Sequence, residues 1–307
     1  MKILIVGLGS IAQKHIESIK NLDFDCTIYA LRSSKNVEQS KNIINIFSLD
    51  DLDVIFDFAI ISNPTNLHYK FIRLLANKNI PLFIEKPAIH SLENSSELIS
   101  LIESKNLITY VACNLRFHPC ILFLKDYLKS LQYRINEVNV YCGSYLPDWR
   151  PGKDFKKIYS ANKNMGGGVH LDLFHELDYT IWLFGTPFKS SSITRNVSSL
   201  EISAIDYANY ILEYESFTAN IILNYYRKKS KRSIEIVLEN QIILVDLINN
   251  IVIDDNDKIL FESSNYNIKE TYNKQMDYFS NCLIQNVNPM NSLKDSIDVL
   301  KIVLQNG

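Results

Sequence analysis

Two charged residues stand directly behind a short apolar stretch in the first third of the chain. Leu82 to Ile84 are apolar on both faces, as strands of a buried parallel sheet are, and Glu85, Lys86 and Pro87 follow at once. Pro87 has no backbone N–H and therefore ends the strand. Because ligands of open parallel sheets bind beyond the carboxyl ends of the strands, we expect Glu85 and Lys86 at a ligand site. A surface ion pair that caps the strand is the alternative.

A glycine-rich turn follows the first apolar stretch of the chain. Residues 2–6 (KILIV) are predicted to form a strand, and residues 7–12 (GLGSIA) open a helix. This is a G-x-G-x-x-A pattern in the strand–turn–helix context that a dinucleotide site requires. Gly7 permits the tight turn, Gly9 lets the backbone approach a pyrophosphate, and Ala12 allows close packing of helix on strand. The sequence therefore predicts a dinucleotide cofactor here.

The end of the second strand bears on which dinucleotide is bound. The strand Cys26 to Leu31 runs into Arg32, Ser33 and Ser34, where an NAD site commonly has a carboxylate for the ribose hydroxyls. A guanidinium beside two hydroxyls suits the 2′-phosphate of NADP(H), which we predict as the preferred cofactor. An NAD(H) site that lacks its acid, with Arg32 solvated, is the alternative.

Strand and helix patterns alternate throughout residues 1–119, which predicts a doubly wound parallel sheet. The carboxyl ends of its strands share one edge, so the residues behind them are expected to contact the cofactor, together with the first helix N-terminus. In addition to Gly7, Gly9, Arg32 and Ser33, these residues are Ser10, Ile11, Ser62, Asn63, Pro64, His68, Glu85, Lys86 and Asn114.

The pattern changes after Pro119. Most of residues 190–263 alternate with period two between short polar turns, which predicts long strands of an antiparallel sheet. We therefore predict a dinucleotide-binding domain at 1–119 and a substrate-binding domain at 120–307. The basic run Arg227 to Arg232 is interpreted as a solvated hairpin turn.

Three glycines, Gly166 to Gly168, precede a segment that carries an acid and an imidazole. On the helix predicted there, residues three and four apart share a face, so Asp172 is expected beside His175 and Glu176. This pairing suits proton transfer, since histidine titrates near neutrality. A structural histidine with its hydrogen bonds satisfied is the alternative.

An aromatic and basic segment leads into these glycines. Its residues from Trp149 to Lys163 are predicted to meet a phosphate-bearing substrate, with a solvated surface loop as the alternative. The residues expected to line the substrate side are Tyr145, Trp149, Arg150, Lys153 and Tyr159.

Composition indicates an ordinary globular protein. The formal net charge of −2 gives no electrostatic reason to expect nucleic acid or an anionic membrane as a partner. The 5 cysteines are scattered without C-x-x-C spacing, which suits reduced thiols in the cytoplasm and predicts no metal site. No apolar run reaches the roughly 18 residues of a membrane span.

Several of these motifs occur together in one known family. They are GLGSIA at 7–12, NPTNLH at 63–68, Glu85-Lys86-Pro87, RFHP at 116–119 and GGG…D…H…D at 166–178. In this order the chain resembles the Gfo/Idh/MocA family of NAD(P)-dependent oxidoreductases over essentially its whole length. The resemblance implies a Rossmann domain and a second domain with an open antiparallel sheet. The face of that sheet commonly forms dimers or tetramers, so a homodimer or homotetramer is expected.

The resemblance also implies hydride transfer at a sugar, cyclitol or related carbon, with Lys86 and an Asp/His pair at the nicotinamide. The family commonly has its Asp and His four residues apart, whereas here His175 lies three and Glu176 four residues after Asp172. A branch that reads GGG-V-x-L-D-L-S-H-E-L-D, with Ser where Phe174 stands, shares this spacing. That branch resembles enzymes of bacterial surface-polysaccharide pathways.

We therefore expect a hydride transfer between nicotinamide and a carbinol or carbonyl carbon of a sugar or nucleotide sugar in surface glycan biosynthesis. Lys86 is expected to orient the substrate oxygen, His175 to act as acid and base, and Asp172 to be its electrostatic partner. Glu176 is expected at the substrate and competes with His175 as proton acceptor. The alternatives are a cyclitol dehydrogenase, a C=N or tetrapyrrole reductase, and a non-catalytic NADP-binding regulatory protein.

Overall fold

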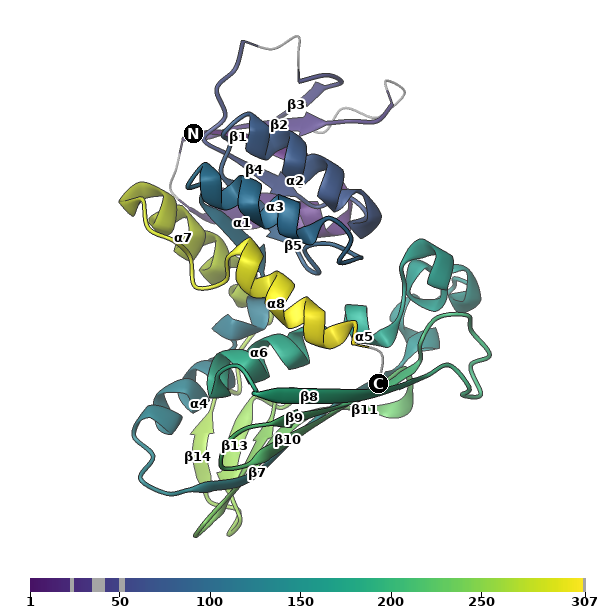
Figure 1. Ribbon diagram of the computed structural model, residues 1–307, viewed down its shortest axis with the longest axis vertical. Helices are drawn as coiled ribbons and strands as arrows, with labels where there is room; N and C mark the ends of the chain where they lie inside the picture. The colour runs from purple at the N-terminus through teal and green to yellow at the C-terminus, as the bar shows by residue number, and fades with distance from the viewer. Residues whose placement is uncertain (23–24, 35–41, 50–52, 306–307) are drawn as a thin grey trace. The chain divides into compact units, whose positions relative to one another are not determined.

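The computed structural model describes residues 1–22, 25–34, 42–49 and 53–305 and is shown in Figure 1. Contacts divide the chain into two compact units. The first consists of Met1–Asn114 and Ile268–Asp298, and the second of Leu115–Asn267 and Val299–Gly307. The first unit thus includes a segment from near the C-terminus. The division into functional domains at residues 119 and 120 stays a prediction.

A parallel sheet of six strands forms the centre of the first unit, as the alternating pattern predicted. Its strand order, β3-β2-β1-β4-β5-β6, changes direction between β1 and β4. Val6 lies opposite both Leu31 and Ile61, so these strands end at one edge. The strands are β1 (Lys2–Val6), β2 (Thr27–Leu31), β3 (Ile43–Ile46), β4 (Phe58–Ile61), β5 (Leu82–Glu85) and β6 (Thr109–Ala112).

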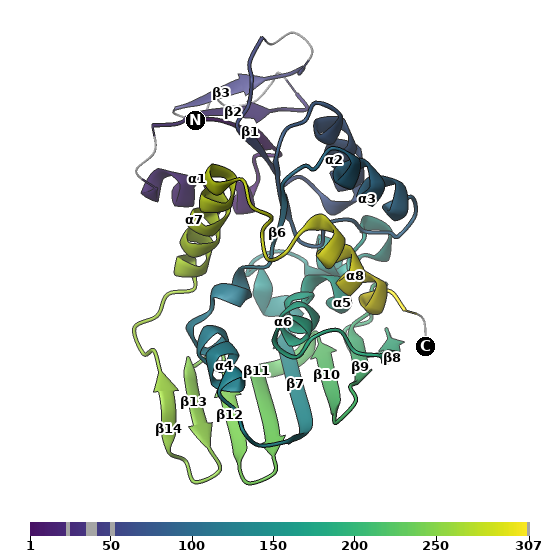
Figure 2. The ribbon, with the colours of Figure 1, turned by 60° about the vertical axis from the view of Figure 1, so that its left-hand side comes forward.

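Helices cover both faces of this sheet. Figure 2 shows α1 (Ser10–Asn21) and α7 (Lys269–Gln285) on one side, and α2 (His68–Asn77) and α3 (Ser95–Ser104) on the other. The ring of Phe279 in α7 lies 5.3 Å from that of Phe58 and 5.5 Å from that of Phe83, centroid to centroid. These buried aromatic contacts explain why α7 belongs to the first unit. The boundary between the units falls within α8 (Leu293–Val303).

An eight-stranded sheet forms the second unit, in the order β14-β13-β12-β11-β7-β10-β9-β8. Neighbouring strands are antiparallel except β7 and β10, which run parallel. Alternate residues are buried under α4 (Pro119–Lys129) and α6 (His175–Phe184), which Figure 2 shows on one face. The strands are β7 (Ile135–Tyr145), β8 (Lys189–Arg195), β9 (Tyr207–Glu213), β10 (Thr218–Asn224), β11 (Tyr226–Leu238), β12 (Ile242–Asp246), β13 (Ile251–Asp254) and β14 (Ile259–Glu262).

The basic run at 227–232 is part of strand β11, so its interpretation as a hairpin turn is wrong. Tyr226 pairs with Tyr145 and Lys231 with Gly143, and the register shifts between these two pairs. The strand is therefore irregular where the charges lie. Aromatic contacts help to accommodate these charges within a strand: Lys231 Nζ lies 5.2 Å from the centre of the Tyr141 ring.

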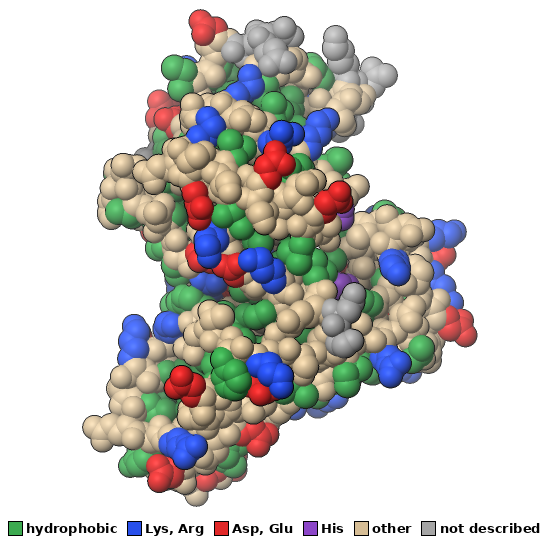
Figure 3. All heavy atoms as spheres, in the orientation of Figure 1, with side chains coloured by type: hydrophobic (Ala, Val, Ile, Leu, Met, Phe, Trp, Pro, Cys, Tyr) green, Lys and Arg blue, Asp and Glu red, His purple; other side chains and the backbone are tan. Residues whose placement is uncertain are grey.

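Charged side chains of both signs are interspersed on the face shown in Figure 3, in keeping with the net charge of −2. Within the described ranges, no helix has both the length and the apolar character needed to cross a lipid bilayer.

Candidate active site

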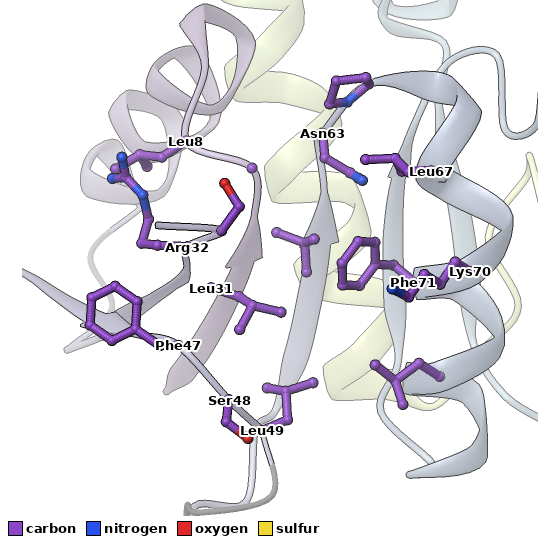
Figure 4. Close-up of a pocket in the computed structure, with 15 residues that line it drawn as sticks. Leu8, Leu31, Arg32, Phe47, Ser48, Leu49, Asn63, Leu67, Lys70 and Phe71 are labelled. Carbon is purple, nitrogen blue, oxygen red and sulfur yellow. The ribbon is translucent and has the colours of Figure 1, made fainter. Parts of the chain in front are cut away.

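A cavity of about 540 Å³ lies in the first unit, at the carboxyl ends of β1, β2 and β4. Five of the predicted cofactor contacts line it, namely Gly7, Arg32, Ser33, Asn63 and Pro64. Figure 4 shows Arg32 and Leu8 at one end of the cavity, with the apolar side chains of Leu67 and Phe71 on the opposite wall. Among the described residues that line the cavity there is no carboxylate.

The two glycines of the first turn differ in what surrounds them. Gly7 has φ +88°, and a Cβ there would lie 2.6 Å from the Cα of Asn63, so the fold itself requires glycine. Gly9 has φ −88°, which any residue adopts. A Cβ on Gly9 would meet no protein atom within 4 Å. The space beside Gly9 is therefore left for something other than this chain's described residues.

The Asn63 side chain gives a second sign of a ligand. Its Nδ2 and Oδ1 atoms are buried and have no hydrogen-bond partner among the described residues. Buried amide groups without partners are costly, and they commonly mark the place of an unseen ligand or water. With Arg32, the open space at Gly9 and the helix N-terminus of α1, the cavity fits a dinucleotide with its phosphates.

Three other predicted cofactor contacts hold the surrounding loops. Ser62 Oγ donates to the carbonyl of Gly7 at 2.9 Å, and the Asn114 amide donates to Thr271 Oγ1 at 2.7 Å. The ring nitrogens of His68 lie 2.9 Å and 3.2 Å from the carbonyls of Asn63 and Ala88. Burial lowers the pKa of His68, which favours the neutral ring. The contacts of Ser62 and His68 fix the loop that carries Asn63.

Glu85 contacts a buried histidine of the first helix. Its Oε1 lies 2.5 Å from Nε2 of His15, which is fully buried in α1, and its Oε2 accepts a hydrogen bond from the Lys86 N–H at 3.2 Å. His15 also packs edge-on against Phe83, with ring centroids 4.8 Å apart. Glu85 thus ties the end of β5 to α1 and fixes the backbone from which Lys86 extends.

In the second unit the glycine run allows a close crossing of two segments. A Cβ on Gly167 would lie 2.1 Å from the carbonyl oxygen of Tyr159, and Gly168 has φ +146°. Tyr159 Oη donates to the Gly166 carbonyl at 2.7 Å. Tyr159, predicted as a substrate contact, therefore also anchors the turn that leads into α5 (Val169–Asp172).

The helix predicted after these glycines is interrupted. It ends at Asp172, the backbone leaves helical geometry at Leu173 (φ −96°, ψ 36°), and α6 begins at His175. Leu173 and Phe174 are both buried, and the break lets two successive apolar residues enter the core. The expectation of one continuous helix from Asp172 through Glu176 is wrong. Asp172 Oδ2 accepts a hydrogen bond from Tyr225 Oη at 2.5 Å.

Glu176 is enclosed in the interior of the second unit. It is fully buried, and its Oε1 lies 2.6 Å from Nε of Arg232 in β11. Burial first, and then this carboxylate, raise the pKa of the neighbouring Tyr179 phenol well above its ordinary value. His175, one residue earlier, is only half-buried. Of the two candidate proton acceptors, His175 is therefore the more accessible.

A buried ion pair fixes the first turns of α6, and a buried histidine lies beside Asp172. Arg116 makes a buried bidentate pair with Asp178, at 2.9 Å from Nε and 2.7 Å from the terminal nitrogen. His170 is buried beside Asp172, and burial lowers its pKa to about 4. His170 is thus neutral at physiological pH, and it does not offer a second titrating imidazole there.

The predicted substrate segment divides into anchored and exposed side chains. Trp149 Nε1 donates to Ser144 Oγ at 2.9 Å, and its ring meets the Tyr225 ring edge-on at 5.3 Å. Tyr145 is half-buried, with Lys228 Nζ 5.7 Å from its ring centre. Arg150 and Lys153 are exposed.

Two other lysines of this segment pair with acids, which offsets part of its positive charge. Lys156 lies 3.1 Å from Glu201, and Lys157 lies 3.5 Å from Asp154.

Three side chains of the site, those of His15, Tyr225 and Arg232, do not stand out in the sequence. His15 follows Ala12 by three residues on the buried face of α1, a position where a polar residue needs a partner. Tyr225 follows Leu223 and Asn224, and all three are buried, so the period-two alternation fails at the end of β10. Arg232 belongs to the basic run at 227–232, so its residue type does not distinguish it from its neighbours.

Comparison with known proteins identifies the family. Residues 1–113 match the family model described as an oxidoreductase family with an NAD-binding Rossmann fold. Residues 131–247 match the C-terminal alpha/beta domain of the same oxidoreductase family. The chain belongs to the Gfo/Idh/MocA oxidoreductase family. Membership confirms the expected family and the fold of both regions.

Individual relatives are distant. An uncharacterised oxidoreductase of Schizosaccharomyces pombe is 28% identical over 73% of this chain, but the match spans only 64% of that protein. Myo-inositol 2-dehydrogenase of Thermotoga maritima is 22% identical over 73% of this chain and 68% of its own length. Among solved structures, UDP-N-acetylglucosamine 3-dehydrogenase from Acidithiobacillus ferrooxidans superposes with a TM-score of 0.78 at 16% identity, over 99% of this chain and 96% of that one. At that identity the likeness concerns the fold alone.

Proposed function

We propose that this chain is a nicotinamide-dependent oxidoreductase that moves a hydride between its cofactor and a carbinol or carbonyl carbon of a carbohydrate. The observation that carries this proposal is the cavity at the ends of β1, β2 and β4, with open space at Gly9 and an unpartnered amide at Asn63. It lies where the strand order changes direction, the place where doubly wound sheets bind dinucleotides. Membership of the Gfo/Idh/MocA oxidoreductase family supports the same function.

NADP(H) is the proposed cofactor. Arg32 and Ser33 line the cavity, and no carboxylate among its described lining residues competes for the ribose hydroxyls. A guanidinium forms strong charge-assisted hydrogen bonds with phosphate, which supports recognition of a 2′-phosphate. The α1 N-terminus, with Ser10 and Ile11, would hold the pyrophosphate beside Gly9.

The proton path is assigned to this chain's own side chains. When bound, a nicotinamide supplies or accepts the hydride. In the oxidation direction His175 takes the hydroxyl proton as the hydride leaves the same carbon, and in reduction it returns that proton to the carbonyl oxygen. Lys86 orients the oxygen, and Asp172 stabilises the charged imidazole. Glu176 is assigned to its ion pair with Arg232, because it is fully buried.

A nucleotide sugar in surface glycan biosynthesis is the proposed substrate class. On the segment from Trp149 to Lys163, the exposed side chains of Arg150 and Lys153 are proposed to contact the phosphate of the substrate. Trp149 and Tyr145 provide aromatic surface beside them. The UDP-sugar dehydrogenase among the structural neighbours has the same fold. A cyclitol is the second candidate, because an inositol dehydrogenase aligns with 73% of the chain.

We also propose a homodimer or homotetramer formed through the open face of the second sheet. Tyr141 on that face is contacted by Arg227, 5.1 Å from the ring centre, and by Lys231. Tyrosine and arginine are enriched at protein interfaces, which supports the proposal. Sedimentation of the full chain would measure the state directly.

A substrate panel followed at the nicotinamide absorbance tests the function. NADPH and NADP⁺ are offered with UDP-linked hexosamines and their oxidised forms, free hexoses, and inositols. Turnover is expected with a UDP-linked sugar, at a higher kcat/KM than with the free sugar. Equal kcat/KM for the two forms would overturn the phosphate contact. Tight cofactor binding without turnover on any member would favour the non-catalytic regulatory protein.

A further inference from the structure

We infer that Tyr225 is the positioning residue for the Asp172 carboxylate. The inference rests on the proposed function, because it gives Asp172 a task at the substrate. Tyr225 lies at the bend between β10 and β11, 53 residues from Asp172 in sequence. Its Oη donates to Asp172 Oδ2 at 2.5 Å. Asp172 is the last residue of the short helix α5. A carboxylate at a helix end needs an external contact to hold one orientation.

Contacts within the second unit hold both the backbone and the ring of Tyr225. The Tyr225 N–H donates to the Asp206 carbonyl at 3.0 Å, and its carbonyl accepts from the Leu146 N–H at 2.8 Å. Trp149 packs edge-on against its ring, with centroids 5.3 Å apart. The side chain is fully buried. These contacts restrict the ring of Tyr225, and they transmit the rigidity of the sheet to the carboxylate.

The direction of the hydrogen bond is fixed as well. Burial, and next the Asp172 carboxylate, raise the pKa of the Tyr225 phenol well above its ordinary value. The phenol stays protonated and remains the donor, so Asp172 is the acceptor. The titratable groups that act on this pair include His170, whose pKa burial lowers to about 4, and Tyr159. The proposed function adds the imidazole of His175, whose charged form Asp172 would stabilise.

Such a bond matters for catalysis because proton transfer depends on placement. A hydrogen bond to the charged form of a carboxylate favours that form, and a fixed orientation keeps its negative charge aimed at one site. If the carboxylate rotated freely, the stabilisation of a charged imidazole would be averaged over its orientations. Tyr225 thus acts on the reaction through Asp172 and is not itself a catalytic group.

Tyr225→Phe removes the hydroxyl and keeps the ring, and Tyr210→Phe is its matched control. Tyr210 is also a fully buried tyrosine of the second unit, and its hydroxyl donates to the Val303 carbonyl at 2.9 Å, away from Asp172. With the substrate found by the panel, Tyr225→Phe should lower kcat on the order of 10- to 100-fold, with KM values for cofactor and substrate within about twofold. As pH falls, the kcat of Tyr225→Phe should begin to decline at a higher pH than that of the wild type, because the Asp172 carboxylate has lost a donor that favours its charged form. The control should change neither.

A double mutant separates positioning from other roles. In an Asp172→Ala background, Tyr225→Phe should have no further effect on kcat, since the residue acts only through that carboxylate. An additive loss would overturn the inference. A kcat equal to that of the Tyr210→Phe control would overturn it too, and so would a raised substrate KM with unchanged kcat, which would place the phenol on the substrate.

A measurement without substrate distinguishes failure of this inference from failure of the proposed function. With tyrosine labelled at the carbon that bears the hydroxyl, the Tyr225 NMR signal is assigned by its absence from Tyr225→Phe. It should move on Asp172→Ala and stay in place on Glu176→Gln. No movement overturns the contact. Movement in a chain that turns over nothing in the panel keeps the contact and rejects the proposed function.

Discussion

At the scale of single residues, the charge of Arg32 should decide between cofactors. Arg32→Ala removes a guanidinium from the cavity wall, so binding of NADP(H) should weaken by roughly 1.5–3 kcal/mol, while that of NAD(H) should change little. Fluorescence or calorimetric titration of both cofactors measures this. Arg73→Ala is the control, because Arg73 is an exposed α2 residue paired with Glu97 at 3.2 Å and absent from the cavity wall. Equal wild-type affinities for the two cofactors would reject the preference.

His170 gives a pH dependence of stability. Its pKa is about 4 in the folded chain and near 6.5 when unfolded, so between these values the unfolded state binds more protons. Stability is therefore lost as pH falls through this window. Between pH 7 and pH 5, His170 should contribute a loss of about 2 kcal/mol, to order of magnitude. Denaturant unfolding of wild type and His170→Gln at both pH values measures it. An undiminished pH dependence in the variant would show that His170 is not the cause.

At the scale of elements, two substitutions in the turn between β1 and α1 should affect stability and cofactor binding separately. Gly9→Ala meets no protein atom within 4 Å, so stability should be retained while NADP(H) affinity falls. Gly7→Ala forces a side chain at φ +88° against the Asn63 backbone, and should destabilise by roughly 1–3 kcal/mol. Thermal unfolding and cofactor titration of both variants give the comparison. Unchanged affinity in Gly9→Ala would mean that nothing approaches this turn.

Local sequence patterns were enough to predict most helices and strands. They failed where contacts with residues remote in sequence determine the local structure. The strand at residues 2–6, the glycine turn and the helix of α1 follow from apolar spacing and glycine chemistry alone. The break at Leu173 could not be predicted, because helical spacing continues through it in the sequence. The basic run at 227–232 looked solvated, since its partners Tyr141 and Glu176 are remote in sequence.

The same limit applies to the candidate site. The residue types at Lys86, Asp172 and His175 could be singled out from motifs. The residues that hold them are selected by tertiary contacts: His15 binds Glu85, Tyr225 binds Asp172, and no local pattern links either pair.

At the scale of the whole molecule, the chain is divided into units that are not continuous in sequence. Helix α7 lies near the C-terminus, yet it belongs with the N-terminal sheet through Phe279. Phe279→Ala should therefore destabilise the cofactor-binding unit by about 3–5 kcal/mol. Ile284→Ala, on the same helix but 65% exposed, should cost little. Denaturant unfolding followed with and without NADPH measures both, and equal losses in the two variants would contradict this division.

The central claim is that this chain moves a hydride between a nicotinamide and a carbohydrate carbon with His175 as acid and base. The most direct measurement is mass spectrometry of the product formed from NADPH deuterated at nicotinamide C4, for wild type, His175→Ala and Glu176→Gln. The wild type should place deuterium on the sugar carbinol carbon. His175→Ala should slow this transfer about 10²–10⁴-fold with cofactor affinity retained, and Glu176→Gln should mainly lower stability. Transfer at a near-normal rate in His175→Ala, with its loss in a folded Glu176→Gln, would contradict the account.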